Sequence, residues 1–257
     1  MSYNFLLKTK NNILNNFKLK TNQIDIWEFP YNIIPIKLAK NFLNSQEISK
    51  ASKLNFNYHK HKFIINRALL KIILSHYLKQ NIHKLKLNFN KNGKPFINYK
   101  YIQLEFNLSH SYKISLLAIG KKYPIGIDVE FFFKRNFNKI IKKILNFEEL
   151  TIFNQISEKF KPTVFYKIWT QKEAFIKTFG LKITFPMSYP CSWTIETLIN
   201  NLKVELKSKN NQYWNIMSFS PKNLYNASIC YSQKIKTIRY RTIYPQNFYK
   251  YFYKINN

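Results

Sequence analysis

Two acidic residues stand two positions apart in the segment PIGIDVE, residues 124–130. In a β-strand, successive side chains alternate between faces, so Asp128 and Glu130 share one face while Ile127 and Val129 point into a core. Paired carboxylates repel each other unless a cation lies between them, and their hard oxygens suit Mg²⁺. Two solvated acids on an exposed strand would show the same spacing, so the pair alone is a candidate metal site.

A second set of charged residues lies in residues 163–179, whose apolar side chains follow helical spacing. Glu173 falls at the edge of the apolar stripe, and Lys177 follows one turn later as an i, i+4 partner. An ordinary surface ion pair, which contributes about 0.3–0.5 kcal/mol, would look the same. Lys172 falls near the middle of the stripe, so its ammonium must reach the rim or meet an anion, because an unpaired buried charge is costly.

A histidine flanked by two serines ends the segment FNLSHS, residues 106–111. A lone histidine is usually a structural or surface group, but beside hydroxyls at a strand end His110 can also hydrogen-bond a phosphate. Acidic residues are scarce in this chain, and Asp25 and Asp128 are its two aspartates. Half of the 12 acids fall between positions 128 and 173, which indicates a local requirement for negative charge.

Taken in order, FNLSHS, PIGIDVE and the segment WTQKEAFIK at 169–177 resemble three motifs of the 4'-phosphopantetheinyl transferase superfamily. The family pattern is an S-H motif, a G-[IV]-D-[IV]-E strand and a W-[ST]-x-K-E-[AS]-x-x-K helix, and the Sfp-like branch is the closest match. The resemblance spans roughly residues 45–185. It includes the turn Gly93-Lys94-Pro95 and the acidic segment FEEL at 147–150. Any one motif would be weak, but three in this order are specific.

The resemblance implies a transfer reaction. Such enzymes move the 4'-phosphopantetheine arm of coenzyme A onto a serine of an apo acyl or peptidyl carrier protein and release 3',5'-ADP. The implied fold is α+β, a pseudo-twofold pair of similar halves with the active site in the cleft between them. The run of predicted elements places the boundary near residue 124. Residues 1–124 are then expected on the coenzyme A 3'-phosphate side and residues 125–257 on the metal and catalytic side.

By this resemblance Asp128, Glu130 and Glu173 are the Mg²⁺ ligands. Glu173 is also the expected general base for the carrier serine, directly or through a water, with Glu149 as an alternative participant. Lys177 is expected to contact a phosphate oxygen of coenzyme A.

The other coenzyme A contacts follow from the same resemblance. His110 and Ser109 are expected at the 3'-phosphate, and Lys172 beside Lys177. A gapless alignment of the N-terminal basic residues gives Lys50 and Lys62, although others allow Lys53, Lys60 or Arg67. Lysines replace the family's usual arginines there, which loses bidentate phosphate geometry. The expected cofactor-binding set is Lys50, Lys62, Gly93, Lys94, Pro95, Ser109, His110, Lys172 and Lys177.

Composition limits the alternatives. The chain of 257 residues carries 42 Lys+Arg and a formal net charge of +30. Hydrophobic residues make up 46% of it, a content too high for a disordered chain. Two cysteines, Cys191 and Cys230, exclude a disulfide framework and a four-cysteine zinc site. No segment has the apolar run of a signal peptide or a transmembrane helix. We therefore expect a cytoplasmic protein, or one made inside an organelle such as a plastid, and by family resemblance a monomer.

The high charge supports two hypotheses about partners. A basic enzyme would attract the typically acidic carrier proteins, and a compositionally biased genome favours a housekeeping carrier of fatty acid biosynthesis. The competing hypothesis is a nucleic-acid-binding protein, suggested by the charge and by the interleaved aromatics of residues 240–253. A genome poor in G and C would favour Lys, Asn, Ile, Phe and Tyr and so explain both features. No recognisable nucleic-acid-binding motif is present.

These residues must be positioned by an α+β set of elements. Ser45 is expected to cap a helix over 45–80, and Gly180 to end the helix over 163–179. Residues 137–160 are expected to be helical with a break near Asn146. The expected strands are 83–90, the short stretch to Tyr99 after the turn at 91–95, 104–108, 113–119, 125–131, 192–196, 202–207, 213–219 and 226–231, before a basic, aromatic tail from 234.

Overall fold

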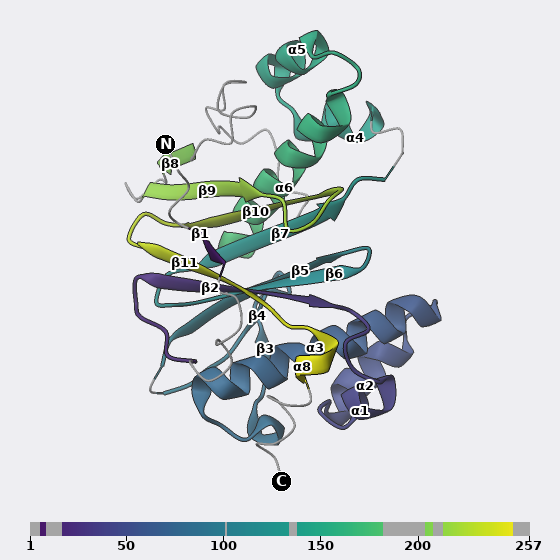
Figure 1. Ribbon diagram of the computed structural model, residues 1–257, viewed down its shortest axis with the longest axis vertical. Helices are drawn as coiled ribbons and strands as arrows, with labels where there is room; N and C mark the ends of the chain where they lie inside the picture. The colour runs from purple at the N-terminus through teal and green to yellow at the C-terminus, as the bar shows by residue number, and fades with distance from the viewer. Residues whose placement is uncertain are drawn as a thin grey trace.

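Two β-sheets lie face to face, and helices cover the outer face of each, as the computed structural model shows (Figure 1). The structure describes residues 6–8, 17–100, 102–133, 138–181, 204–207 and 213–248. The α+β class is therefore confirmed, while the pseudo-twofold relation between the halves stays a prediction. Among the described residues, no helix has both the length and the apolar content needed to cross a membrane.

The first sheet has the strand order β1-β11-β2-β6-β5. Its strand β11 runs parallel to both β1 and β2, whereas β2 with β6 and β6 with β5 are antiparallel. Its strands are β1 (Leu6–Lys8), β2 (Gln23–Pro30), β5 (Leu104–Ser111), β6 (Ile114–Lys121) and β11 (Thr237–Thr242).

The second sheet is antiparallel, with the order β7-β10-β9-β8. The chain passes from the first sheet to the second between β6 and β7, close to residue 124, and β11 later returns it to the first sheet. Its strands are β7 (Ile125–Phe131), β8 (Val204–Lys207), β9 (Tyr213–Phe219) and β10 (Tyr225–Ser232), and a separate small pair is formed by β3 (Asn88–Phe89) and β4 (Pro95–Phe96).

The helices divide between the two outer faces (Figure 1). The long helix α3 (Asn57–Leu78) lies under the first sheet together with α1 (Ile36–Lys40), α2 (Ser45–Ser52), the 3₁₀ turn η1 (Ile82–Lys84) and the C-terminal α8 (Pro245–Phe248). The second sheet is covered by α6 (Lys161–Phe179), with α4 (Asn138–Ile144) and α5 (Phe147–Gln155) beyond it.

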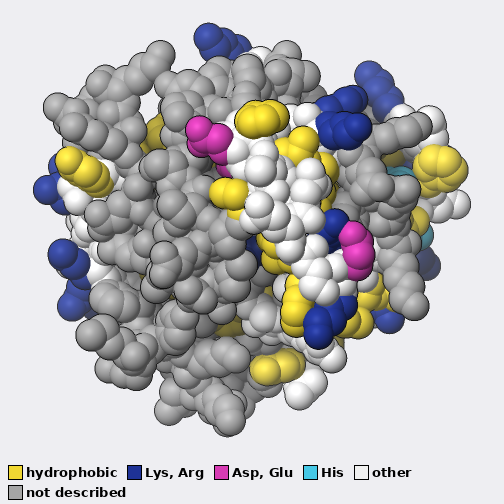
Figure 2. Space-filling model, turned by 90° about the horizontal axis from the view of Figure 1, so that it is seen from above, with side chains coloured by type: hydrophobic (Ala, Val, Ile, Leu, Met, Phe, Trp, Pro, Cys, Tyr) yellow, Lys and Arg dark blue, Asp and Glu magenta, His cyan; other side chains and the backbone are white. Residues whose placement is uncertain are grey.

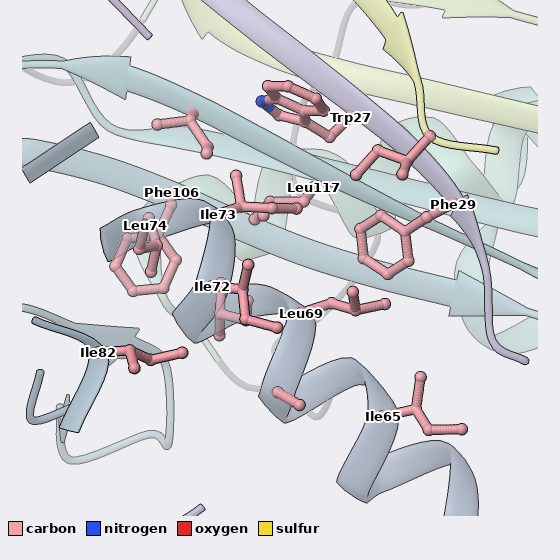
Figure 3. Close-up of a cluster of buried hydrophobic side chains, with 14 of the residues drawn as sticks. Trp27, Phe29, Ile65, Leu69, Ile72, Ile73, Leu74, Ile82, Phe106 and Leu117 are labelled. Carbon is pink, nitrogen blue, oxygen red and sulfur yellow. The ribbon is translucent and has the colours of Figure 1, made fainter. Parts of the chain in front are cut away.

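Three apolar layers hold this arrangement together. Figure 3 shows the layer between α3 and the first sheet, where Leu69 and Ile73 meet Trp27 and Leu117. A second layer lies between the sheets and contains Ile127 and Val129, so the predicted inward face of this strand is confirmed. The third packs α4, α5 and α6 against β9 and β10. Each large side chain buried in this way contributes about 1.5–3 kcal/mol.

Several predicted elements are confirmed. The predicted strands 125–131 and 213–219 coincide with β7 and β9. The predicted strands 104–108 and 226–231 lie inside β5 and β10, and the predicted strand 113–119 overlaps most of β6. The helix over 163–179 ends at Gly180, and the break near Asn146 separates α4 from α5. Residues 202–207 contribute β8 through Val204–Lys207, and residues 192–196 lie outside the described residues.

The prediction for residues 45–80 was wrong in two respects. The segment forms two helices, α2 and α3, and the N-cap of α2 is Asn44 rather than Ser45. The Asn44 side chain accepts a hydrogen bond from the Glu47 backbone N–H at 2.8 Å, and the Glu47 carboxylate accepts one from the Asn44 N–H at 3.0 Å. This reciprocal capping box satisfies two backbone donors, which a serine cap alone would not.

The strand predicted over 83–90 was also largely wrong. Residues Ile82–Lys84 form a 3₁₀ turn whose cap, Asn81, accepts a hydrogen bond from the His83 N–H. The strand β3 is confined to Asn88–Phe89, and both of its side chains are exposed. Its partner β4, Pro95–Phe96, is shorter than the predicted stretch to Tyr99. The alternation has another cause, because Leu85 is buried in the core beside α3 and Leu87 packs against that core without joining a strand ladder.

Candidate functional site

Strand β7 and helix α6 approach each other closely at Gly126. A Cβ atom at this position would lie 1.9 Å from the carbonyl oxygen of Ala174 and 2.5 Å from the backbone nitrogen of Thr178. Only glycine permits such an approach of helix to strand. Gly126 shares its strand face with Asp128 and Glu130. The same contact therefore places the carboxylates of β7 against the side chains of α6.

Asp128 is buried beside two donors from different elements. Its Oδ1 accepts hydrogen bonds from the Ser109 hydroxyl at 2.8 Å and from the Lys177 ammonium at 2.5 Å. The other oxygen, Oδ2, is buried without a hydrogen-bond partner in the described part of the chain. Glu130, one strand period further, accepts a hydrogen bond at Oε2 from the Ser111 hydroxyl at 2.8 Å. Two carboxylates thus stand in line, each held by a serine of β5.

Glu173 brings a third carboxylate from α6. It is buried, and its Oε1 has no hydrogen-bond partner within the described residues. Burial raises the pKa of Glu173 to about 7. Lys177 opposes that shift, and repulsion by Asp128 and Glu130 adds to it. For Lys177 burial lowers the pKa, but attraction by Asp128, Glu173 and Glu130 outweighs it, so the pKa is raised and the ammonium stays charged.

The three carboxylates fit a hard divalent cation. They supply oxygen ligands from two elements. Within the described residues, Asp128 Oδ2 and Glu173 Oε1 are buried and accept no hydrogen bond. As the side chains stand, the described residues contain no cluster of three His, Cys, Asp or Glu ready to hold a metal. Lys177 provides the positive charge beside Asp128 instead. A metal here would therefore require Lys177 to move and a ligand to complete the shell.

The turn that carries Gly93-Lys94-Pro95 is fastened to both elements of the site. Gly93 has φ +88°, a left-handed conformation that suits glycine. The Asn92 side-chain amide donates to the carbonyl of Gly180 at 2.8 Å, just past the end of α6. The Lys94 ammonium donates to the carbonyls of Thr178 at 2.8 Å and Ile125 at 3.2 Å. The Lys94 ammonium therefore binds backbone carbonyls of both elements and links α6 to β7.

Two neighbouring cavities lie against these residues. The carboxylate cavity, of about 340 Å³, is lined by the turn, by α6 and by Asn107, and it includes Glu173 and Lys177. The basic cavity, of about 380 Å³, lies between α3 and β5. The two cavities adjoin, because Pro95 and Asn107 line both of them. Each cavity alone is in the size range of a small-molecule site.

The basic cavity gathers basic side chains. Its lining includes His59, Lys62, Arg67 and His110. Burial lowers the pKa of Lys62, and attraction by Glu130 opposes this, so Lys62 lies between the two charged regions. The pKa of His110 is lowered to about 4, first by surrounding protein atoms that desolvate its ring and then by repulsion from Lys62. A neutral imidazole in a field of positive charge is a ready donor for an anion.

Other predicted site residues lie elsewhere. The Lys172 ammonium donates to Glu149 at 2.7 Å and to the carbonyl of Ile144 at 2.5 Å, so this buried pair faces α4 and α5 rather than β7. The expectation that Lys172 meets an anion is confirmed, but that anion is Glu149. Lys50 stacks its ammonium 5.2 Å from the ring centre of Phe89 and does not line either cavity.

Sequence reasoning missed Asn107 and Ser111. The side-chain oxygen of Asn107 accepts a hydrogen bond from the Ile127 backbone N–H at 2.8 Å, and Ser111 holds Glu130. The signal was present in FNLSHS, because residues 107, 109 and 111 share one face of a strand. It could not be interpreted without knowing that β5 lies beside β7.

Comparisons with known proteins agree with this geometry. A family model described as the 4'-phosphopantetheinyl transferase superfamily matches residues 124–230, and one described as the N-terminal part of 4'-phosphopantetheinyl transferase matches residues 34–121. The two matches meet where the chain passes from one sheet to the other.

Individual relatives carry the same kind of name. The 4'-phosphopantetheinyl transferase HetI of Nostoc sp. is 28% identical over 64% of this chain and 72% of its own length. The transferase gsp of Aneurinibacillus migulanus is 28% identical over 58% of this chain and 62% of its own. The transferase Sfp of Bacillus subtilis is 26% identical over 57% of this chain and 65% of its own.

Proposed function

The chain belongs to the 4'-phosphopantetheinyl transferase superfamily, and we propose that it transfers the 4'-phosphopantetheine arm of coenzyme A to a serine of an apo carrier protein with the aid of Mg²⁺. The family and transferase activity predicted from the three motifs are thereby confirmed, and a nucleic-acid-binding role is not favoured. The proposal adds to the family the metal, the residues that act, and the nature of the carrier.

One observation carries the proposal. Glu173 lines one end of a pair of adjoining cavities, where Asp128 and Glu130 are near enough to repel it, and the other end is lined by basic side chains. Coenzyme A carries a 3'-phosphate and a pyrophosphate, so it needs a cationic region and a second region that can hold a metal. The basic cavity supplies the first, and the carboxylate cavity supplies the second.

Asp128, Glu130 and Glu173 are the residues that would hold Mg²⁺. When bound, the metal would neutralise negative charge that develops on the pyrophosphate during transfer. Magnesium characteristically keeps waters and substrate oxygens in its shell, so three carboxylates are ample. The buried, unpartnered oxygens of Asp128 and Glu173 support this assignment.

The proton of the carrier serine would go to Glu173, directly or through a water. The serine oxygen forms a bond to the phosphorus that bears the pantetheine arm, and the bond from that phosphorus to the bridging oxygen breaks. The leaving group is 3',5'-ADP, which takes the bonding electron pair. Burial raises the pKa of Glu173 to about 7 in the metal-free protein, and a bound cation would lower it, so Glu173 would be ionised and able to accept a proton near neutral pH.

Lys177 would leave its protein partner and bind the substrate. It now neutralises Asp128, and its ammonium also donates to the Ser109 hydroxyl at 3.2 Å. When a cation takes its place, the ammonium at the edge of the carboxylate cavity is free to bind a phosphate oxygen. Release of one partly buried ion pair is thus offset by a new charge-assisted hydrogen bond.

The 3'-phosphate would lie in the basic cavity. His110 of β5 and Lys62 of α3 would bind it, since both line this cavity, and Arg67 is a further cation in its wall. Arg67 is one of the alternatives that the alignment of the basic segment allowed. Lys50 lines neither cavity, so the proposal assigns the phosphate to Lys62 and Arg67 rather than to Lys50.

The carrier protein is expected to be acidic. The chain carries a formal charge of +30, and in Figure 2 basic side chains are spread around the rim of the face, where acidic ones are sparse. Such a surface would speed encounter with an anionic partner, and added salt would screen the attraction. We expect a monomer to act on a single carrier at a time.

The test is the intact mass of an apo acyl carrier protein incubated with the purified protein, coenzyme A and Mg²⁺. We expect a gain of one phosphopantetheine arm, which EDTA abolishes. Glu173→Gln should abolish it too, while Glu148→Gln, at an exposed acid of α5, should leave it intact. No gain with any of several acyl and peptidyl carriers, from protein with a cooperative melting transition, would contradict the proposal.

A further inference from the structure

Strands β5 and β7 are edge strands of different sheets that lie side by side. Each stands at the end of its sheet order, and no backbone ladder joins them within the described residues. Edge strands present unpaired backbone groups that need partners. Here side chains of β5 supply them, since Asn107 accepts from the Ile127 N–H at 2.8 Å and Ser111 accepts from the Phe131 N–H at 3.0 Å.

The same face of β5 also holds the carboxylates. The hydroxyl of Ser109 donates to Asp128 Oδ1 and the hydroxyl of Ser111 donates to Glu130 Oε2, each at 2.8 Å. Residues 107, 109 and 111 alternate along one strand, so their spacing matches that of the β7 groups they contact. The contacts run in register from Ile127 to Phe131 and cover the whole segment that carries the two acids.

Each serine fixes one carboxylate oxygen and so fixes where the other can point. The fixed oxygen of Asp128 faces Ser109 and Lys177, and Oδ2 is left for another ligand. Ser111 both receives the Phe131 N–H and donates to Glu130, so its hydroxyl is locked in direction. A free carboxylate would lose rotamer freedom on binding a cation, whereas a preoriented one has already lost it.

We propose that Asn107, Ser109 and Ser111 form a positioning seam that sets the carboxylates of β7 in the orientation a divalent cation requires. This inference rests on the proposed function, because it takes Asp128 and Glu130 as ligands. It gives Ser109 a role at the carboxylates rather than at a phosphate. Asn107 lines both cavities, so through it the seam reaches the wall that the two cavities share.

The residue to test is Ser111, because it lines neither cavity and its removal should not disturb coenzyme A directly. Partners that orient metal ligands typically change metal affinity by about 10–100-fold when they are lost. We therefore expect Ser111→Ala to weaken Mn²⁺ binding by that factor, measured by electron paramagnetic resonance in the presence of coenzyme A. Ser111→Thr, which keeps the hydroxyl, should bind Mn²⁺ within a few-fold of wild type.

Two further readings separate positioning from general damage. Coenzyme A affinity in EDTA should be the same for wild type and Ser111→Ala. Ser75→Ala, which removes a buried hydroxyl bonded to the Ile72 carbonyl within α3, should not change Mn²⁺ affinity. If Ser111→Ala does not fold, Ser111→Cys keeps the size with only a weak donor, and it should show the same weakening.

The outcomes distinguish the two proposals. If wild type binds Mn²⁺ with coenzyme A and modifies a carrier while Ser111→Ala does both equally well, the seam is overturned and the proposed function stands. If Ser111→Thr is as weak as Ser111→Ala, the effect is one of packing and the seam is again overturned. If wild type itself neither binds Mn²⁺ nor modifies a carrier, the proposed function fails, and the seam fails with it.

Discussion

Replacing Gly126 with alanine should damage both the fold and the site. The added Cβ would lie 1.9 Å from the Ala174 carbonyl oxygen, where ordinary contact begins at 3.4 Å, so α6 must retreat from β7 by about 1.5 Å. The obstructing atoms are backbone, which cannot rotate away. Overpacking of this kind costs about 1–3 kcal/mol, and we expect a loss of about 3 kcal/mol in the free energy of unfolding.

The same retreat should slow the reaction by about 100-fold or more. A retreat of about 1.5 Å would carry Glu173 of α6 away from Asp128 and Glu130 of β7, the carboxylates proposed to hold one cation together. A misplacement of about 1 Å in a catalytic site can cost about 100-fold in rate. Urea unfolding measures the first effect, and the rate of carrier modification by the folded fraction measures the second.

A matched control is available at Gly120. A Cβ there would lie 2.5 Å from Ile125 Cδ1, the far end of a flexible side chain that can rotate. Gly→Ala also stabilises a chain by about 0.4–1 kcal/mol through its unfolded state, which would offset that contact. We expect Gly120→Ala to lie within about 1 kcal/mol of wild type and to remain active. A Gly126→Ala protein as stable and as active as Gly120→Ala would refute the reasoning.

Three other perturbations have defined outcomes. Lys172→Met should lower the free energy of unfolding in urea by about 3–5 kcal/mol, because it leaves the buried Glu149 carboxylate without its partner. The double variant Lys172→Met/Glu149→Leu should lose less than Lys172→Met alone, and additive losses would contradict this pairing. Lys94→Met should cost about 1–3 kcal/mol by orphaning two carbonyls, with little change in coenzyme A affinity; a selective loss of affinity would instead place its ammonium on the substrate. In proton NMR the His110 ring should titrate near pH 4 in the free protein. Its midpoint should move upward with 3',5'-ADP, because a bound phosphate favours the protonated ring, and an unmoved midpoint would exclude His110 from the phosphate site.

The carboxylate site could be predicted because its signals are local. Alternation along β7 placed Asp128 and Glu130 on one face and their apolar neighbours in the core, and both placements hold. The roles of Lys172 and Lys94 could not be read in the same way. Their ammonium groups are taken by Glu149 and by backbone carbonyls, and those partners are set by the packing of α6 rather than by motif spacing.

The strands β2 and β11 were missed because their signals are not local. β2 is buried along almost its whole length and yet contains Asp25 and Glu28, so it has neither alternation nor an apolar run. Asp25 is neutralised by Arg239 at 2.6 Å and Arg241 at 3.2 Å, both from β11, more than 200 positions away. The scarcity of aspartate marked Asp25 as unusual, but only the parallel pairing of β11 with β2 explains it.

The central claim is that the carboxylates of β7 and α6 serve a group transfer, and counting the products of one turnover tests it most directly. A limiting amount of apo carrier protein is incubated with the enzyme, coenzyme A and Mg²⁺, the released 3',5'-ADP is quantified, and the modified carrier residue is mapped by tandem mass spectrometry. We predict one 3',5'-ADP and one phosphopantetheine arm for each carrier, with the arm on a single serine. A carrier with that serine changed to alanine should yield neither product. Release of 3',5'-ADP without an arm on the carrier, or neither product with the intact carrier, would contradict the account.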